Sequence, residues 1–86
     1  MTARKDRKDL RLRASGMIKG ARQARNISQM QLASLVGVSQ PLVSSWECGK
    51  VTPGIDDLVG VEQALEIPKG SLIIGIAYPT PLETGI

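Results

Sequence analysis

The 86-residue sequence contains no histidine and no phenylalanine, a single cysteine, Cys48, and only two aromatic residues, Trp46 and Tyr78. Without histidine, a Ser–His or Cys–His catalytic pair and an imidazole general base are excluded, and most zinc and haem sites lose their usual ligand. One cysteine excludes an internal disulfide and multi-cysteine metal sites, and it suits a reducing cytosol. We therefore expect neither an enzyme nor a cofactor.

Long apolar runs are also missing. No stretch approaches the roughly 18 apolar residues of a membrane span, and no secretory signal is visible, so the sequence predicts a soluble, cytoplasmic protein. A chain of this length forms one domain with a modest core. Because aromatic residues are so few, that core must be built from aliphatic side chains, which supply most of the 42% hydrophobic content.

The net charge of +3 is distributed unevenly along the chain. Residues 1–25 hold nine basic and two acidic side chains, a net charge of +7, whereas residues 26–86 hold two basic and six acidic ones, a net charge of −4. A basic segment on a mildly acidic body indicates an arm for a polyanion such as nucleic acid; the alternative is a solvated, solubilising tail.

Apolar periodicity and capping signals predict five helices and no confident strand. Residues 1–9 lack apolar side chains and are interpreted as a mobile arm, and the first helix is expected to be well formed only over residues 15–25, since Gly16 and Gly20 weaken it. Asn26 ends that helix, and either Thr52 or Gly54 caps the fourth. The last segment, residues 69–77, is helix or strand, and a helix is favoured.

The second and third helices are predicted to form a tight pair. Ser28 and Gln31 form a capping box at the start of residues 29–36, and Ser39 caps the helix from Gln40 to Cys48. A turn of three residues containing Gly37 joins them, which defines a helix-turn-helix. Ala33 is small enough for the second helix of the pair to cross closely above it.

Three blocks of sequence resemble the Cro/C1-type (XRE-like) helix-turn-helix family, whose pattern runs LSQ-x-x-LA, GVS and (V/I)S-x-(W/I)E-x-G. They are Ile27-Ser28-Gln29-Met30-Gln31-Leu32-Ala33, Gly37-Val38-Ser39-Gln40-Pro41 and Val43-Ser44-Ser45-Trp46-Glu47-Cys48-Gly49-Lys50. The resemblance covers about residues 17–74. It implies an all-α, five-helix, lambda-repressor-like domain over residues 15–77, with residues 1–14 as basic arm and start of the first helix and residues 78–86 as a flexible tail.

The same resemblance implies a homodimer that binds double-stranded DNA with the helix Gln40–Cys48 in the major groove. Gln40 can pair with adenine N6 and N7, while Pro41, Ser44 and Ser45 share its exposed face. The candidate DNA-binding residues are Gln29, Ser39, Gln40, Pro41, Ser44, Ser45 and Lys50, with Gln29 and Lys50 on phosphates. No arginine lies on this helix, so DNA shape is expected to carry much of the specificity.

Two further assignments concern charge. The resemblance implies a partly buried ion pair between Arg22 and Glu47, which ties the third helix to the first. The arm Arg4–Arg13 either tracks the phosphate backbone, enters the minor groove or remains a solvated tail.

The sequence also departs from the family pattern. Glu62 stands where a small apolar residue is usual, and Glu66 where glycine often ends the fourth helix. Ile73, Ile74, Ile76 and Tyr78 are either a dimer surface or core. The expected function is that of a transcriptional regulator, a repressor of phage or prokaryotic kind on a palindromic operator. The alternative is an antitoxin that binds a toxin through its C-terminal segment.

Overall fold

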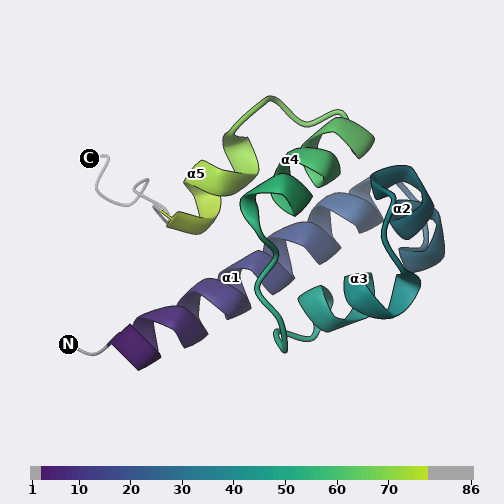
Figure 1. Ribbon diagram of the computed structural model, residues 1–86. Helices are drawn as coiled ribbons and strands as arrows, with labels where there is room; N and C mark the ends of the chain where they lie inside the picture. The colour runs from purple at the N-terminus through teal and green to yellow at the C-terminus, as the bar shows by residue number, and fades with distance from the viewer. Residues whose placement is uncertain (1–2, 78–86) are drawn as a thin grey trace.

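The computed structural model describes the backbone of residues 3–77 and the side chains of residues 8–77. This part of the chain forms five helices and no strand (Figure 1): α1 (Ala3–Ala24), α2 (Gln29–Val36), α3 (Gln40–Glu47), α4 (Ile55–Ala64) and α5 (Ser71–Ala77). The predicted all-α fold is therefore confirmed, and the segment left open between helix and strand is a helix. None of these helices combines the length and hydropathy needed to cross a bilayer.

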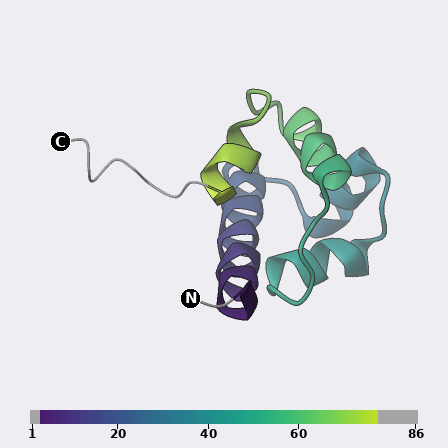
Figure 2. The ribbon, with the colours of Figure 1, turned by 60° about the vertical axis from the view of Figure 1, so that its left-hand side comes forward.

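The long helix α1 is the element against which much of the rest is arranged. It packs against α3 and α5, while α2 packs against both α3 and α4, and α4 contacts α5. Figure 2 shows α1 nearly end to end, with α3 beside the half that contains its N-terminus. This arrangement places the second helix of the α2–α3 pair directly against the basic segment of the sequence.

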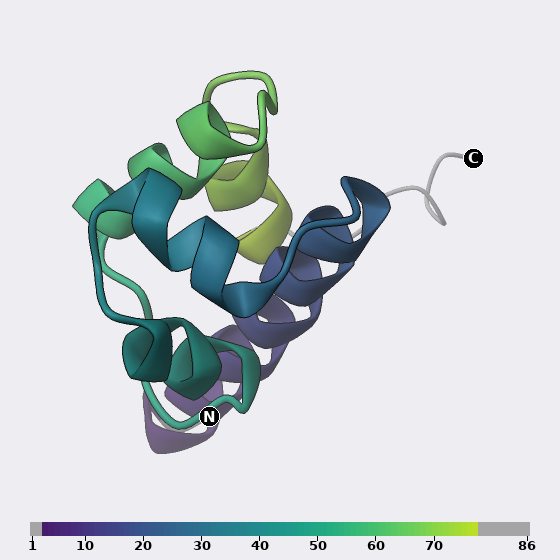
Figure 3. The same ribbon diagram turned by 90° about the vertical axis from the view of Figure 1, so that its right-hand side faces the viewer.

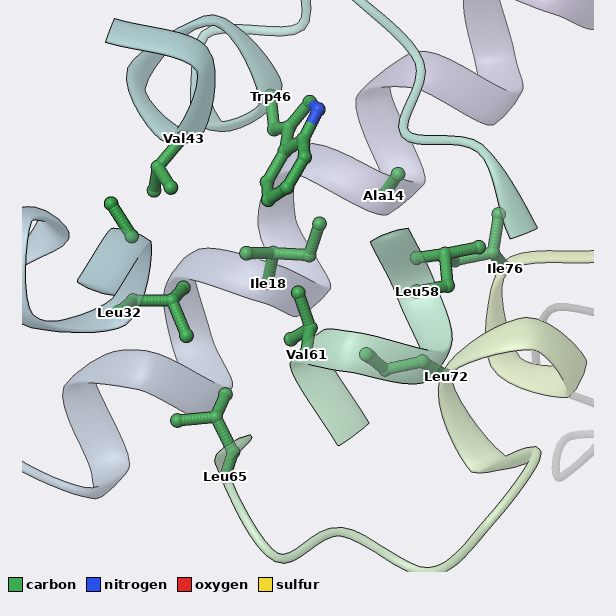
Figure 4. Packing of buried hydrophobic residues seen from close by; sticks show 11 residues of the cluster. Ala14, Ile18, Leu32, Val43, Trp46, Leu58, Val61, Leu65, Leu72 and Ile76 are labelled. Carbon is green, nitrogen blue, oxygen red and sulfur yellow. The ribbon is translucent and has the colours of Figure 1, made fainter. Parts of the chain in front are cut away.

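The core is aliphatic around one indole, as the composition predicts. Trp46 is fully buried and stands among aliphatic side chains from all five helices (Figure 4). Its indole Nε1 has no hydrogen-bond partner among the described residues. The buried hydrophobic residues are Ala14, Ile18, Leu32, Ala33, Val43, Trp46, Leu58, Val61, Leu65, Leu72 and Ile76.

The expected mobile arm is wrong, because α1 begins at Ala3 and includes most of it. Arginine and lysine are good helix formers, and two arginines that follow residues 1–9 are held by the folded body. Arg11 Nε donates to the carbonyl of Gly49 at 3.2 Å, and Arg13 Nε donates to that of Ile76 at 2.8 Å. These contacts extend the helix well before Ser15, where its well-formed part was expected to start.

The predicted caps between α1 and α2 are confirmed. Asn26 adopts the left-handed conformation with φ 56°, which ends α1. The Ser28 hydroxyl accepts a hydrogen bond from the Gln31 backbone N–H, and the Gln31 side chain accepts one from the Ser28 N–H. Both bonds satisfy N–H groups that a helix start leaves without partners. Gly54, rather than Thr52, takes the N-cap position of α4.

The two acidic departures from the family pattern have clear structural roles. Glu62 on α4 is 1% exposed, and its carboxylate accepts hydrogen bonds from the backbone N–H groups of Gly70 and Leu72, each at 2.8 Å. It thus caps the start of α5 from a neighbouring helix, where the helix dipole favours an anion. Glu66 takes the left-handed conformation itself, with φ 57°, where glycine is usual in the family.

The candidate dimer surface at the C-terminal end divides between core and exterior. Ile76 is buried and Ile73 packs against the core, whereas Ile74 remains 59% exposed. Tyr78 and the expected flexible tail 78–86 lie outside the described residues.

Candidate nucleic-acid interface

The turn between α2 and α3 has the geometry that its sequence predicts. Gly37 ends α2 in the left-handed conformation, with φ 87°, and its N–H donates to the Ala33 carbonyl at 2.8 Å. The N–H of Val38 donates to the same carbonyl at 3.0 Å. Ala33 is only 3% exposed, and its side chain belongs to the buried core. Figure 3 shows the two helices in succession, joined by this turn.

Helix α3 begins with local capping and presents small side chains outward. The Ser39 hydroxyl accepts a hydrogen bond from the Leu42 N–H at 3.3 Å, and Pro41 occupies the first turn, where a missing N–H costs nothing. Ser39 and Pro41 are exposed, and Gln40, Ser44 and Ser45 are partly exposed. The opposite face, with Val43, Trp46 and Glu47, is buried.

The ion pair between Arg22 and Glu47 is present and bidentate. Arg22 Nε lies 2.7 Å from Glu47 Oε2, and Arg22 Nη2 donates to Oε1 at 2.9 Å. The side chains are 12% and 3% exposed, so water screens the pair little. A third guanidinium nitrogen donates to the Ile27 carbonyl at 2.8 Å, which also ties the α1–α2 loop to this group.

The charges of this pair support one another. Burial alone would raise the pKa of Glu47, but hydrogen bonds from Arg22 and Gln29, together with the charges of Arg22 and Lys19, hold that pKa below its ordinary value. The hydrogen bond to Glu47 in turn raises the pKa of Arg22 above its ordinary value. Both groups are therefore ionised at neutral pH.

A chain of hydrogen bonds links this ion pair to the first residue of α3. Gln29 Nε2 donates to Glu47 Oε1 at 3.1 Å, and Gln29 Oε1 accepts from Gln40 Nε2 at 2.8 Å. Because the carboxylate can only accept, it fixes which end of the Gln29 amide faces it, and Gln29 then fixes the Gln40 amide. Gln40 keeps its Oε1 and one N–H for another partner.

The C-terminal end of α3 is held by side chains of α1. The Ser15 hydroxyl donates to the Glu47 carbonyl at 2.5 Å, beside the bond from Arg11 to Gly49. These bonds satisfy carbonyl groups that the end of a helix leaves without partners. Gly49 follows with φ 75°, and the Lys50 N–H donates to the Ser45 carbonyl at 3.0 Å, closing the helix.

The structure brings most of the predicted interface residues to one region. Gln29, Ser39, Gln40, Pro41, Ser44 and Ser45 lie on the α2–α3 pair, and exposed Lys50 directly follows α3. The link from Gln29 to Gln40, the supports from Arg11 and Ser15, and exposed Cys48 were not anticipated. Helical spacing offered one signal, because Arg11, Ser15 and Arg22 share a face of α1, as Pro41, Ser44 and Cys48 share a face of α3.

No group of three or more cysteine, aspartate or glutamate side chains within residues 8–77 lies close enough to hold a metal ion. The side chains that the α2–α3 pair presents are amides and hydroxyls, beside the ends of both helices. Such groups bind DNA bases and phosphates.

Comparison with known proteins agrees with this geometry. A helix-turn-helix family model matches residues 18–72, more than half of the chain. No curated protein and no solved structure matches the sequence. Domains of this family bind DNA and are typically not catalytic. The matched region begins within α1, contains the whole α2–α3 pair and ends in α5. The chain therefore belongs to the Cro/C1-type (XRE-like) family of helix-turn-helix DNA-binding domains.

Proposed function

We propose that this chain is a sequence-specific transcriptional repressor that binds a palindromic operator as a homodimer, with α3 in the major groove. The observation that carries the proposal is the chain of hydrogen bonds from Arg22 through Glu47 and Gln29 to Gln40. It holds one amide in a defined orientation at the first position of α3, where helix-turn-helix proteins contact base edges.

The oriented amide of Gln40 matches adenine. Its free Oε1 accepts a hydrogen bond from adenine N6, and the second N–H of Nε2 donates to N7. The neighbouring Pro41, Ser44 and Ser45 are small, so the helix backbone can approach the base edges closely. Pro41 offers an apolar contact for a thymine methyl group, and each serine offers one hydrogen bond.

Phosphate contacts fit the ends of the same two helices. Gln29 retains one side-chain N–H beyond the bond to Glu47, and it stands at the start of α2, where backbone N–H groups face outward. Ser39 is exposed at the start of α3, and Lys50 is exposed after its end. These contacts flank the groove and fix the register of α3 without reading sequence.

Selection of bound duplexes from a random pool tests this function. We expect the wild-type protein to enrich a palindrome with half-sites about one helical turn apart. Gln40→Ala should lose the preference for adenine at one position in each half-site, by roughly 5- to 150-fold, since a bidentate pair contributes about 1–3 kcal/mol. Gln63→Ala, an exposed glutamine on α4, is the matched control and should retain the consensus. An unchanged consensus with Gln40→Ala would contradict the assignment.

The antitoxin alternative depends on the C-terminal segment 73–86, most of which lies outside the described residues. No observation on the described part of the chain favours it.

A further inference from the structure

The N-terminal half of α1 lies against the C-terminal end of α3. Arg11 and Ser15 contact the carbonyls of Gly49 and Glu47, and from Arg11 the helix continues back to Ala3. At 1.5 Å per residue this adds roughly 12 Å of helix beyond the last of these contacts. Figure 1 shows these first turns of α1 extending past the other helices, and Figure 3 shows them behind α3.

One face of this segment is basic. Arg4, Lys8, Arg11 and Ser15 are spaced four, three and four residues apart, so they occupy the same side of the helix as the α3 contacts. We call the positions Arg4, Lys8 and Arg11 the basic face of α1. Asp9 stands about 200° around the helix from Arg11, at a different side. Exposed Lys50 continues the positive charge just after α3.

The carboxylate at the end of α3 is already neutralised. The Glu47 carboxylate is paired with Arg22, so it does not offset the charges of Lys8 or Lys50. Helix α3 itself carries no basic residue. If α3 lies in the groove, the positive charge that attracts the DNA must therefore come from neighbouring elements.

The dimensions place a phosphate strand beside the basic face. Eight residues of α3 span about 12 Å, which is close to the width of the major groove, so a phosphate strand borders each end of the helix. We propose that the basic face of α1 is a second DNA-binding surface, which contacts the phosphates beyond the C-terminal end of α3. This inference rests on the proposed function, because α3 sets where the strand lies.

The helical form of the segment also decides how it binds. An α-helix with its side chains is about 10 Å wide, whereas the minor groove is about 6 Å wide. The segment from Ala3 onward therefore does not enter the minor groove as an extended arm does. It lies along the outside of the duplex, where lysine and arginine side chains reach phosphates of base pairs flanking the half-site.

A salt titration of operator binding tests the surface. We expect the double variant Arg4→Ala, Lys8→Ala to reduce the steepness of log K against log salt by about 3.6 for the dimer, or about 0.9 for each of two phosphate contacts per chain. The ratio of operator to non-operator affinity should stay unchanged. Lys69→Ala, which removes an exposed lysine from the α4–α5 connection, is the control and should leave the steepness as in the wild type. Arg11 is left intact because it supports α3.

A truncated duplex locates the contact. Removing the base pairs outside the half-sites should weaken the wild-type protein, whereas the double variant should bind both duplexes alike. An unaltered salt slope, or equal sensitivity of both proteins to truncation, would overturn the proposal. A lost consensus with Gln40→Ala together with an unaltered slope leaves the proposed function standing without this surface. A reduced salt slope together with an unchanged consensus in Gln40→Ala would support this surface and contradict sequence-specific binding by Gln40 of α3.

Discussion

Glu47 joins three elements through one carboxylate. It accepts hydrogen bonds from Arg22 on α1 and from Gln29 on α2, while it belongs to α3. Removing one partner of a buried ion pair leaves the other charge without compensation, and such changes cost up to about 3–5 kcal/mol. The same carboxylate orients the side-chain amides of Gln29 and Gln40, which we propose contact the DNA. Glu47 therefore contributes both to the stability of the fold and to the proposed DNA recognition.

The ion pair predicts how stability depends on pH. The pKa of Glu47 in the folded protein lies below its ordinary value of 4.5, so its contribution is complete above that value and is lost as the pH falls through the folded pKa. The contribution of Arg22, whose pKa is raised, is complete throughout this range and is lost only at strongly alkaline pH. Urea unfolding between pH 7 and pH 3 should show wild type losing more stability than Glu47→Gln, which is less stable at pH 7.

Comparing the two proteins isolates Glu47 from the other carboxylates, which are common to both. A constant stability difference across this pH range would show that the pair contributes nothing that depends on the charge of Glu47. The reference is Gln63→Ala, an exposed glutamine on α4 outside this cluster, which changes no charge and should follow the wild-type profile.

The residues of this cluster differ in how far sequence could predict them. The pair Arg22–Glu47 was anticipated through the family resemblance. The role of Gln29 was only partly anticipated, because its bonds join residues 11 and 18 positions away in the sequence, and nothing local in a glutamine predicts such partners. Trp46, by contrast, was predictable as the anchor of α3, since no other large aromatic residue was present before Tyr78.

At the scale of elements, α1 contains two glycines that do not serve its packing. A Cβ added at Gly16 or Gly20 would meet no atom within 4 Å, and neither residue has positive φ. We expect Gly16→Ala or Gly20→Ala to raise the free energy of unfolding by about 0.5–1 kcal/mol through helix propensity. Chemical denaturation measures this gain.

The matched control is Gly37→Ala in the α2–α3 turn. Space is also open there, but φ is +87°, which a side chain disfavours. This variant should lose stability by about 1 kcal/mol or more. If both kinds of substitution changed stability alike, backbone conformation would not explain these positions.

The start of α5 depends on Glu62. Glu62→Gln keeps the shape but places an NH₂ group where a backbone N–H needs an acceptor, so we expect a loss of about 1–3 kcal/mol. Amide exchange should become faster at Gly70 and Leu72 than elsewhere in the core. If exchange at these two amides stays at the wild-type rate, the carboxylate does not hold α5.

The elements were predictable where their signals are local. The capping box of Ser28 and Gln31, the left-handed Asn26 and the turn at Gly37 all depend on residues within four positions. The helix α1 is ordered before Ser15, and two contacts that hold it there span 38 and 63 residues, from Arg11 to Gly49 and from Arg13 to Ile76. No periodicity in the first nine residues indicates these partners.

At the scale of the whole molecule, charge and sequence reading are divided between elements. The segment 1–25 carries a net charge of +7, while α3 carries no basic residue and presents glutamine, proline and serine. We infer that α1 supplies much of the affinity and α3 the selectivity. In a dimer on a palindrome, each chain would place one such pair of helices on its half-site.

The central claim is that α3 faces the DNA, and Cys48 provides a direct measurement of it. Cys48 is the only cysteine, is exposed, and shares the face of α3 that carries Pro41 and Ser44. The rate of its alkylation by iodoacetamide should fall at least about tenfold when saturating operator duplex is bound, because the groove wall covers that face. An unchanged rate with the operator bound would show that this face of α3 is turned away from the DNA.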